Sequence, residues 1–322
     1  MAKLIDVSRS LRLLLAFLIL VVVIHESVEG RTIAKASNKA ILKTLKGDND
    51  EIVDCYDVYK QPSLNNPLLQ NQTIQQAKII LQGDGFRGAQ AKINIWKPVT
   101  EPGEYSASIV SVAAGDDGGE SINVGWQVNS ALYGDNEARF FVFWTADNSK
   151  STGCYDLKCT GFVQTSSVIY PGITFNPIAG SVFQGTQYDA TFSIFQDQST
   201  GNWWVQYQGS EVGYYPPSLF KQLSIKGTAV HIGGLIFNTR NQGRHTATQM
   251  GSGHLPSEGK FGVSSYFSQV KVIDGNNIAR DPKTVVVYQT NPNCYGLSVD
   301  HHQHLQGYGF FYGGPGFSYN CQ

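Results

Sequence analysis

Charged residues are scarce in this sequence. Asp, Glu, Lys and Arg make up 15% of its 322 residues, and the formal net charge is −1. Because no segment gathers basic residues into a stripe, the composition disfavours both nucleic acid and an anionic membrane surface as partners. Methionine is also rare, with two residues, whereas there are 34 glycines, 17 phenylalanines and 16 tyrosines. That balance is typical of many short strands joined by tight turns.

A convincing helical period is missing after residue 77, and alternation of apolar and polar residues recurs instead. In residues 89–96, for example, small or apolar side chains alternate with polar ones until Pro98 ends the strand. Strands at this spacing predict an antiparallel sandwich or barrel. The expected strands cover residues 89–96, 105–113, 122–128, 139–145, 161–165, 188–196, 202–208, 227–237, 260–272 and 284–289.

Long apolar runs are also missing, apart from one near the N-terminus at residues 13–24. Three basic residues precede this run, and Val28 and Gly30 suit cleavage before Arg31, which is the layout of a secretory signal peptide over residues 1–30. The run is short for a membrane span, which needs about 20 residues, so a short N-terminal anchor is the less favoured alternative. Cleavage would leave a soluble chain with no membrane attachment, long enough for one large β domain with a small appendage.

Five cysteines are present, and in a secreted protein they are expected to pair where geometry allows. Cys154 and Cys159 lie close together in the sequence. A bond between Cys294 and Cys321 would fix the C-terminus. Cys55 is then left without a partner, which is unusual for a secreted chain.

Residues 31–76 differ in texture from the rest of the chain. Apolar residues between Ala40 and Leu45 could line one face of a short helix that ends at Gly47. The remainder has little regular period and is interpreted as an irregular appendage. It contains Asn71, which begins the one N-glycosylation sequon with a permitted middle residue.

One expected strand carries a possible binding surface. Around residues 121–128, Asn123, Gly125 and Gln127 point away from the apolar side of the strand. A glycine between two amides leaves room for a ligand to approach the backbone. A solvated sheet face with a glycine that relieves twist is the alternative.

A second strand, residues 230–237, is a candidate for the same surface. His231, Gly233 and Leu235 share one side of it, and Gly234 adjoins Gly233. Adjacent glycines indicate either a close approach by a ligand or a bulge that curves the sheet.

Other polar clusters offer weaker chemistry. Residues 244–254 gather two histidines with Thr, Gln and Ser, but GSGH is not the G-x-S-x-G elbow of a serine hydrolase. His301, His302 and His304 lack HExxH spacing and have no neighbouring cysteine pair. We therefore expect a polar turn at these histidines, and neither a metal nor a cofactor.

Several long motifs occur in a familiar order. They include VDCYDVYKQPSLNNPLLQNQTIQ, AKINIWKP, GWQVNSALYGDNEARFFVFWTADNSKSTGCYDLKCTGFVQ, HTATQMGSGHLPSEGKFGVSSYF and the terminal FYGGPGFSYNC. Together they make the chain resemble the neprosin family of plant secreted proteins, glutamic peptidases of the prolyl-endopeptidase type and their relatives. The resemblance covers nearly all of the chain after residue 30.

The resemblance implies an antiparallel β-sandwich over residues 77–322, similar to other glutamic peptidases and to lectin-like sandwiches, after an activation-type segment at residues 31–76. It also implies chemistry by two glutamates that face each other across a cleft. One activates a water, and the other, protonated, polarises the scissile carbonyl and donates to the leaving amine. Two carboxyls that share a proton have widely split pKa values, which suits acid pH.

This sequence departs from the family pattern at both glutamates. The matching positions, in SINVGWQV and IGGLI, are occupied by Asn123 and Leu235. Among possible substitutes, Glu120 is expected on the opposite side of its strand, while Glu211 and Glu258 are expected in loops. Loss of one general acid or base commonly costs about 10² to 10⁴-fold in rate, so family-type proteolysis should be essentially absent.

A second departure concerns the linker that follows the activation segment. The CPEGTIPIRR motif of the family is missing, and Gln76 runs almost directly into the domain. The cysteine of that motif would be the natural partner of Cys55. A mispredicted exon is the alternative explanation for the gap.

The favoured hypothesis is a secreted, catalytically silent protein whose cleft still binds a Pro-rich peptide or a cell-wall polymer. Trp203 and Trp204 could stack on such a ligand, although only one of them can face the groove. The alternatives are an active acid endopeptidase that cleaves at proline with other carboxylates, and a product that folds poorly because Cys55 is unpaired. The expected location is the extracellular space or apoplast, with the vacuole as the alternative.

Overall fold

The computed structural model describes residues 41–46, 52–56, 73–115, 119–175, 180–239 and 245–321. The chain divides into two compact units, Met1–Asn66 and Pro67–Gln322. The expected signal peptide at 1–30 and the sequon at Asn71 lie outside the described residues. Within the described part, no helix has the length and apolar character needed to cross a bilayer.

The first unit contains a two-stranded hairpin. Strand β1 (Ile41–Lys46) pairs antiparallel with β2 (Ile52–Tyr56). The prediction of a short helix between Ala40 and Leu45 is therefore wrong. The backbone of this segment pairs with strand β2 instead of forming hydrogen bonds within itself. The backbone of Cys55 lies in β2, but its side chain is outside what the structure describes.

The second unit is made of two antiparallel sheets, which confirms the expected all-β sandwich. We call the seven-stranded sheet, in the order β16-β3-β13-β5-β6-β7-β8, the groove sheet, and the nine-stranded sheet the back sheet. The strands of the groove sheet are β3 (Thr73–Phe86), β5 (Tyr105–Ala114), β6 (Glu120–Asn129), β7 (Arg139–Thr145), β8 (Cys154–Tyr155), β13 (Gly227–Asn238) and β16 (Val286–Gln289).

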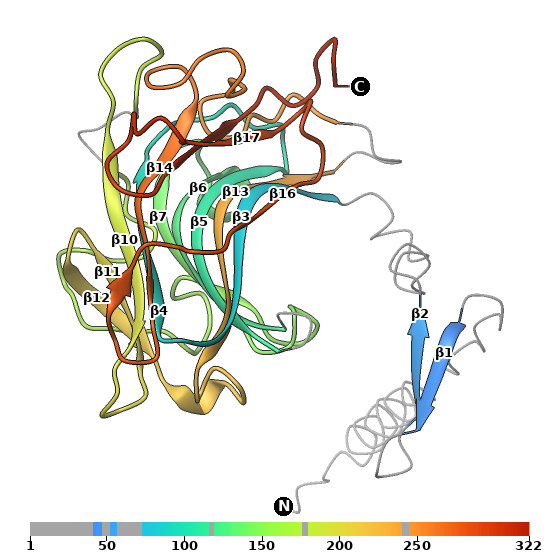
Figure 1. The fold of residues 1–322 in the computed structure, drawn as a ribbon, viewed down its shortest axis with the longest axis vertical. Helices are drawn as coiled ribbons and strands as arrows, with labels where there is room; N and C mark the ends of the chain where they lie inside the picture. The colour runs from blue at the N-terminus through green and yellow to red at the C-terminus, as the bar shows by residue number, and fades with distance from the viewer. Residues whose placement is uncertain are drawn as a thin grey trace, which may run out of the picture. The chain divides into compact units, whose positions relative to one another are not determined.

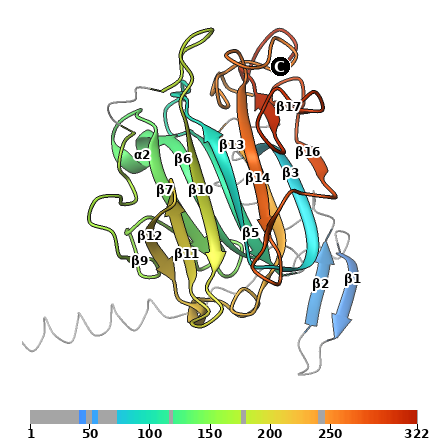
Figure 2. The ribbon, with the colours of Figure 1, turned by 60° about the vertical axis from the view of Figure 1, so that its left-hand side comes forward.

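The back sheet follows the order β17-β18-β14-β4-β10-β11-β12-β9, with β15 paired to β14. Figure 1 shows its strands β4, β10 and β14 beside the bowed strands of the groove sheet, and Figure 2 shows the two layers from the side of the back sheet. Its strands are β4 (Gly88–Asn94), β9 (Val163–Gln164), β10 (Asp189–Gln196), β11 (Trp203–Tyr207), β12 (Ser210–Tyr215), β14 (Ser265–Ile273), β15 (Ala279–Arg280), β17 (Gly296–Val299) and β18 (Phe310–Gly313).

The core lies between the sheets and is built by alternation along the strands. In β6, Ile122, Val124, Trp126 and Val128 are all completely buried. The indole Nε1 of Trp126 donates to the backbone oxygen of Asn94 in the back sheet, at 3.1 Å. Because each large side chain buried this way contributes about 1.5–3 kcal/mol, the inner face strongly fixes which residues of each strand point outward.

All the strands expected from the sequence are present, most of them with displaced ends. The segment expected at 260–272 begins only at Ser265, because residues 260–263 form a turn in which Val263 N donates to the Lys260 oxygen. Strand β3, Thr73–Phe86, was not expected. Strands β8, β12, β15, β17 and β18 of this unit were not expected either.

Two disulfides brace the second unit, as expected from the sequence. Cys154 bonds to Cys159, and Cys294 bonds to Cys321, with Cα–Cα distances of 6.0 and 5.1 Å. The first closes the turn after β8, and the second ties the C-terminal end to the segment before β17.

Backbones approach closely beneath the outer face at Gly125, which lies opposite Ile109. A Cβ added at Gly125 would lie 1.9 Å from the carbonyl oxygen of Ser108. We expect Gly125→Ala to destabilise the protein by about 2 kcal/mol or more, because β5 and β6 must separate to admit the methyl group. Urea unfolding would measure the change.

Gly275→Ala is the matched control. Gly275 is exposed, and the nearest atom to its added Cβ lies at 3.7 Å, so its free energy of unfolding should change by less than about 0.5 kcal/mol. Equal unfolding midpoints for Gly125→Ala and the unmodified protein would contradict the close approach.

Candidate functional site

The strands of the groove sheet are bowed (Figure 1). The side chains on its outer face line two hollows and form rows that follow the strand register. The first row is Ile80, His231, Ser111, Asn123 and Phe143. The second is Lys78, Gly233, Ile109, Gly125 and Phe141. The third is Gln76, Leu235, Ala107, Gln127 and Arg139.

Two hollows of about 310 and 470 Å³ adjoin on this face. Asn123 and Leu235 line both, so the hollows are continuous, and we call them together the groove. His231 and Gly233 line the smaller hollow, and Gln127 lines the larger. The structure thus brings most of the cleft residues expected from two distant strands to one surface.

Two glycines expected in the cleft, Gly125 and Gly234, line the hollows less than their neighbours do. Gly125 is buried and does not line either hollow. Gly234 borders the smaller hollow, but an added Cβ there would meet the sulfur of Met250 at 2.5 Å, on the core side. Both glycines serve close packing beneath the groove.

In the register of the groove sheet, Asn123 shares a row with His231 rather than with Leu235. Only β5 separates Asn123 from His231, through Ser111, so their backbones lie about 10 Å apart. Leu235 lies four residues further along β13, a displacement of about 13 Å along the strand. Side chains at 123 and 231 therefore share one row, two strands apart, whereas 123 and 235 are related diagonally.

No carboxylate lines the groove among the residues that the structure describes. Glu120, the acid nearest Asn123 in sequence, is buried and turned to the other side of β6. Its carboxylate accepts hydrogen bonds from the backbone N–H groups of Lys221, Gln222 and Leu223, at 2.8–2.9 Å. It holds a loop of the back sheet in place and is not available to a ligand in the groove.

The remaining acidic candidates are also placed elsewhere. Glu211 lies in the exposed part of β12 rather than in a loop. Glu258 accepts from His254 and from the N–H of Leu255 in an exposed turn. The fully buried Glu104 accepts from Thr239, Thr246 and Thr248.

Gln127 is held at the groove by a hydrogen-bonded chain. Strand β6 ends at Asn129, whose side chain caps helix α2 (Ser130–Tyr133) by accepting from Leu132 N. Gln127 donates to the Tyr133 hydroxyl at 3.0 Å, and that hydroxyl donates to the carboxylate of Asp156 at 2.8 Å. Asp156 is 6% exposed, and burial raises its pKa to about 6.

The opposite end of the groove is positively charged. Lys78 projects from β3 between Gly233 and Tyr288, with its Nζ 5.5 Å from the centre of the Tyr288 ring. Burial lowers the pKa of Lys78 to about 8. Burial, and secondarily the charge of Lys78, lowers the pKa of His231 to about 4, so the imidazole is neutral at ordinary pH.

Residues 102–315 match the sequence profile of the Neprosin family, which is more than half of the chain. The chain belongs to the Neprosin family. Both positions assigned to the glutamates from the resemblance, Asn123 and Leu235, fall inside this match. Membership of the Neprosin family suggests a peptidase-related function.

Several solved structures match this chain at low sequence identity. Scytalido-glutamic peptidase with a peptide-based transition-state analogue is 12% identical, with 74% of this chain and 98% of that chain covered and a TM-score of 0.40. SCP-B, an Eqolisin-family peptidase in complex with the tripeptide Ala-Ile-His, is 11% identical over the same shares, with a TM-score of 0.36. Bacillus licheniformis β-glucanase is 8% identical over 52% of this chain and 64% of that chain, with a TM-score of 0.29.

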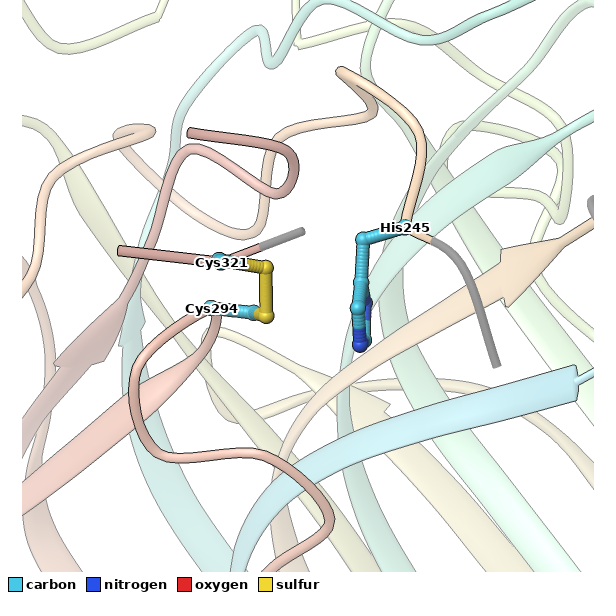
Figure 3. Close-up of side chains that lie close together, drawn as sticks. All are labelled: His245, Cys294 and Cys321. Carbon is cyan, nitrogen blue, oxygen red and sulfur yellow. A yellow bond between two sulfur atoms is a disulfide. The ribbon is translucent and has the colours of Figure 1, made fainter. Parts of the chain in front are cut away.

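A buried cluster near the C-terminus has the residue types of a metal site (Figure 3). Ligand atoms of His245, Cys294 and Cys321 lie within 4.8 Å of one another. The two cysteines are bonded to each other, so neither offers the thiolate that a metal would need. His245 shares a hydrogen bond with the Asn291 amide at 3.2 Å, and the cluster serves as a brace.

The other polar clusters lie outside the groove. In residues 245–254, Thr246 and Thr248 bond to Glu104, while His254 pairs with Glu258 in the exposed turn. His304 bonds to Asp300 at 2.8 Å in the polar turn expected from the sequence. These residues do not form a common catalytic centre.

The expectation that Trp203 or Trp204 could face the groove is wrong. Both belong to β11 of the back sheet. Trp203 is fully buried and donates to the Leu223 oxygen at 2.7 Å. Trp204 packs on Tyr214 away from the core, with ring centres 4.9 Å apart.

Sequence reasoning missed the residues that β3 and the turn before β8 bring to the groove. Gln76 and Lys78 line it from β3, and Asn148 lines it from the turn. The available signal was the alternation of Ile74, Gln76 and Lys78 with Gln75, Ala77 and Ile79. It was weak because Gln75, on the inner face, is polar yet buried.

The raised pKa of Asp156 predicts a pH dependence of stability. The unfolded carboxyl releases its proton near pH 3.9, whereas the folded one retains it until about pH 6. The stability that protonated Asp156 provides is therefore complete well below pH 3.9 and is lost as the pH rises through 6. The free energy of unfolding should fall by about 3 kcal/mol through this group.

Asp156→Asn should remove this fall from urea-unfolding curves measured from about pH 3 to about pH 7. Asp197→Asn is the control. Hydrogen bonds from Ser199 and Thr200 lower the pKa of the exposed Asp197 to about 2, so this variant should keep the fall. Parallel pH curves for Asp156→Asn and the unmodified protein would show that Asp156 titrates normally.

Proposed function

We propose that this chain is a catalytically inactive member of the Neprosin family that binds an extended peptide in the groove. The observation that carries the proposal is the absence of any carboxylate among the described residues that line the groove. Asn123 and Leu235 occupy the positions where the resemblance places the two glutamates.

Hydrolysis by two carboxyl groups needs one group that takes a proton from water and another that gives a proton to the substrate. The amide of Asn123 can hydrogen-bond to a carbonyl but transfers no proton, and Leu235 can do neither. His231 shares a row with Asn123, but the other members of that row, Ile80, Ser111, Asn123 and Phe143, carry no acid or base. The groove therefore lacks the paired acid and base of the expected mechanism.

The groove retains surfaces suited to binding. An aromatic wall at the β7–β8 end contains Phe141, Phe143 and Tyr155, with the Phe143 and Tyr155 rings 4.7 Å apart. Flat aromatic surfaces accept proline rings of extended peptides. The amide of Asn123 on β6 lies between the wall and β3, and the amide of Gln76 adjoins Lys78 on β3; both can bond to a peptide backbone.

The proposal includes secretion to the extracellular space. The two disulfides support it, because such bonds persist in oxidising compartments. The N-terminal sequence of residues 1–30 supports it by its signal-like layout. A cell-wall polymer is the second ligand to be tried, because sugar rings also stack on aromatic faces.

Peptidase assays with a pool of Pro-containing peptides from pH 2.5 to pH 7 test the inactivity. We expect the purified protein to leave the pool intact at every pH. Cleavage that survives removal of contaminating peptidases would overturn the proposal and direct attention to acids outside the groove.

Two double variants test the geometry of the lost chemistry. Asn123→Glu with Leu235→Glu restores the pair that the resemblance indicates, and Asn123→Glu with His231→Glu places two carboxyls in one row of the sheet. Cleavage by either pair would show that the groove still positions a peptide bond. Comparison of the two pairs would show which spacing the chemistry uses.

Secretion makes a separate prediction. Expressed in a eukaryotic host, the protein should appear in the medium with an N-terminus at Arg31 and with a glycan on Asn71. N-terminal sequencing and the mass change on enzymatic deglycosylation, with Asn71→Gln as the control, would measure both. Retention of residues 1–30 in a membrane fraction would favour an anchor instead.

A further inference from the structure

The groove contains one lysine and no acidic group among the described residues that line it. Lys78 is partly buried, and among the described residues its ammonium group contacts the ring of Tyr288. Burying a cation without a counter-ion is costly. A ligand that brings a negative charge to this point would therefore gain more than a neutral one.

The charges around Lys78 reinforce this asymmetry. On β3 itself, its outward neighbours are Gln76 and Ile80, and from β13 the titratable neighbour is His231. From β16 the titratable neighbour of Lys78 is Tyr288. Strand β17, Gly296–Val299, carries no charged residue. The lowered pKa of Lys78 has burial as its cause, without an opposing carboxylate, and leaves the amine protonated below about pH 8.

We propose that the ligand of the groove is an acidic peptide, in which a Glu or Asp side chain pairs with the ammonium group of Lys78. This inference rests on the proposed peptide-binding function of the groove. The peptide lies across the strands, with its carboxylate at the β3 end and an apolar or proline residue on the aromatic wall at the β7 end.

The strand order sets the spacing between the two anchor points. From β3, the sheet passes through β13, β5 and β6 to reach β7, which is four strand separations or about 19 Å. An extended peptide rises about 3.3 Å per residue. The acidic residue and the proline should therefore stand about six residues apart.

The experiment measures binding of fluorescent decapeptides to the full-length protein by anisotropy at pH 6. Each peptide carries one Pro and one Glu six residues apart. In one peptide the Glu precedes the Pro, and in another it follows the Pro. Matched peptides carry Gln in place of Glu, or move the Glu next to the Pro. We expect the spaced Glu peptide to bind about tenfold more tightly than its Gln counterpart.

Three variants assign the preference to Lys78. Lys78→Gln should abolish the tenfold difference between the Glu and Gln peptides, while Lys78→Arg should keep most of it. Lys150→Gln removes the same charge from the exposed turn after β7 and should leave the difference intact. Thermal unfolding of each variant verifies that the fold is preserved.

The outcomes separate this inference from the function on which it rests. Equal binding of Glu and Gln peptides, unchanged in Lys78→Gln, would overturn the acidic preference while leaving a peptide-binding groove. An equal loss in Lys78→Gln and Lys150→Gln would overturn direct pairing in favour of overall charge. Binding of no peptide to any of these proteins would overturn both proposals.

Discussion

The structure depends on one constraint, the burial of a single face of each strand between the two sheets. In β6, every second residue is sealed in the core, and a shift of register by one residue would expose all of them. The same alternation therefore fixes the outer face. Asn123, Gln127, His231 and Leu235 reach one groove because Ile122, Trp126, Ile232 and Ile236 must point inward.

The buried carboxylates of the second unit have internal hydrogen-bond partners, whereas the partly buried Lys78 does not have one among the described residues. Glu120 is satisfied by three backbone N–H groups and Glu104 by hydroxyl and N–H groups, while Asp156 receives the hydroxyl of Tyr133 and the N–H of Val142. Each carboxylate thus stabilises a loop or a turn. Lys78 has no such internal partner among the described residues, which leaves the groove with an unbalanced positive charge.

Prediction from the sequence succeeded where the residues of a segment fit a single period. It failed where pairing with a distant strand decided the structure. Strand β7 was predicted with its exact ends, Arg139 and Thr145, since its aromatic and β-branched residues have no competing period. The hairpin strand β1 was mistaken for a helix, because Ile41, Leu42 and Leu45 fit either period and only β2 resolves the choice. Trp203 and Trp204 were placed on the correct opposite faces of a strand, but the sheet to which β11 belongs is a matter of long-range pairing.

The sequence by itself determined the β class, the family, the two disulfide pairs and the identities of Asn123 and Leu235, neither of which carries a carboxyl group. These follow from residue identities and from alternation within single strands. Only the tertiary structure decided that His231 rather than Leu235 shares a row with Asn123, that Glu120 is bound to a loop, and that Lys78 stands in the groove. The physical reason is that register and sheet order join residues more than a hundred positions apart, and their hydrogen bonds leave no local pattern in the chain.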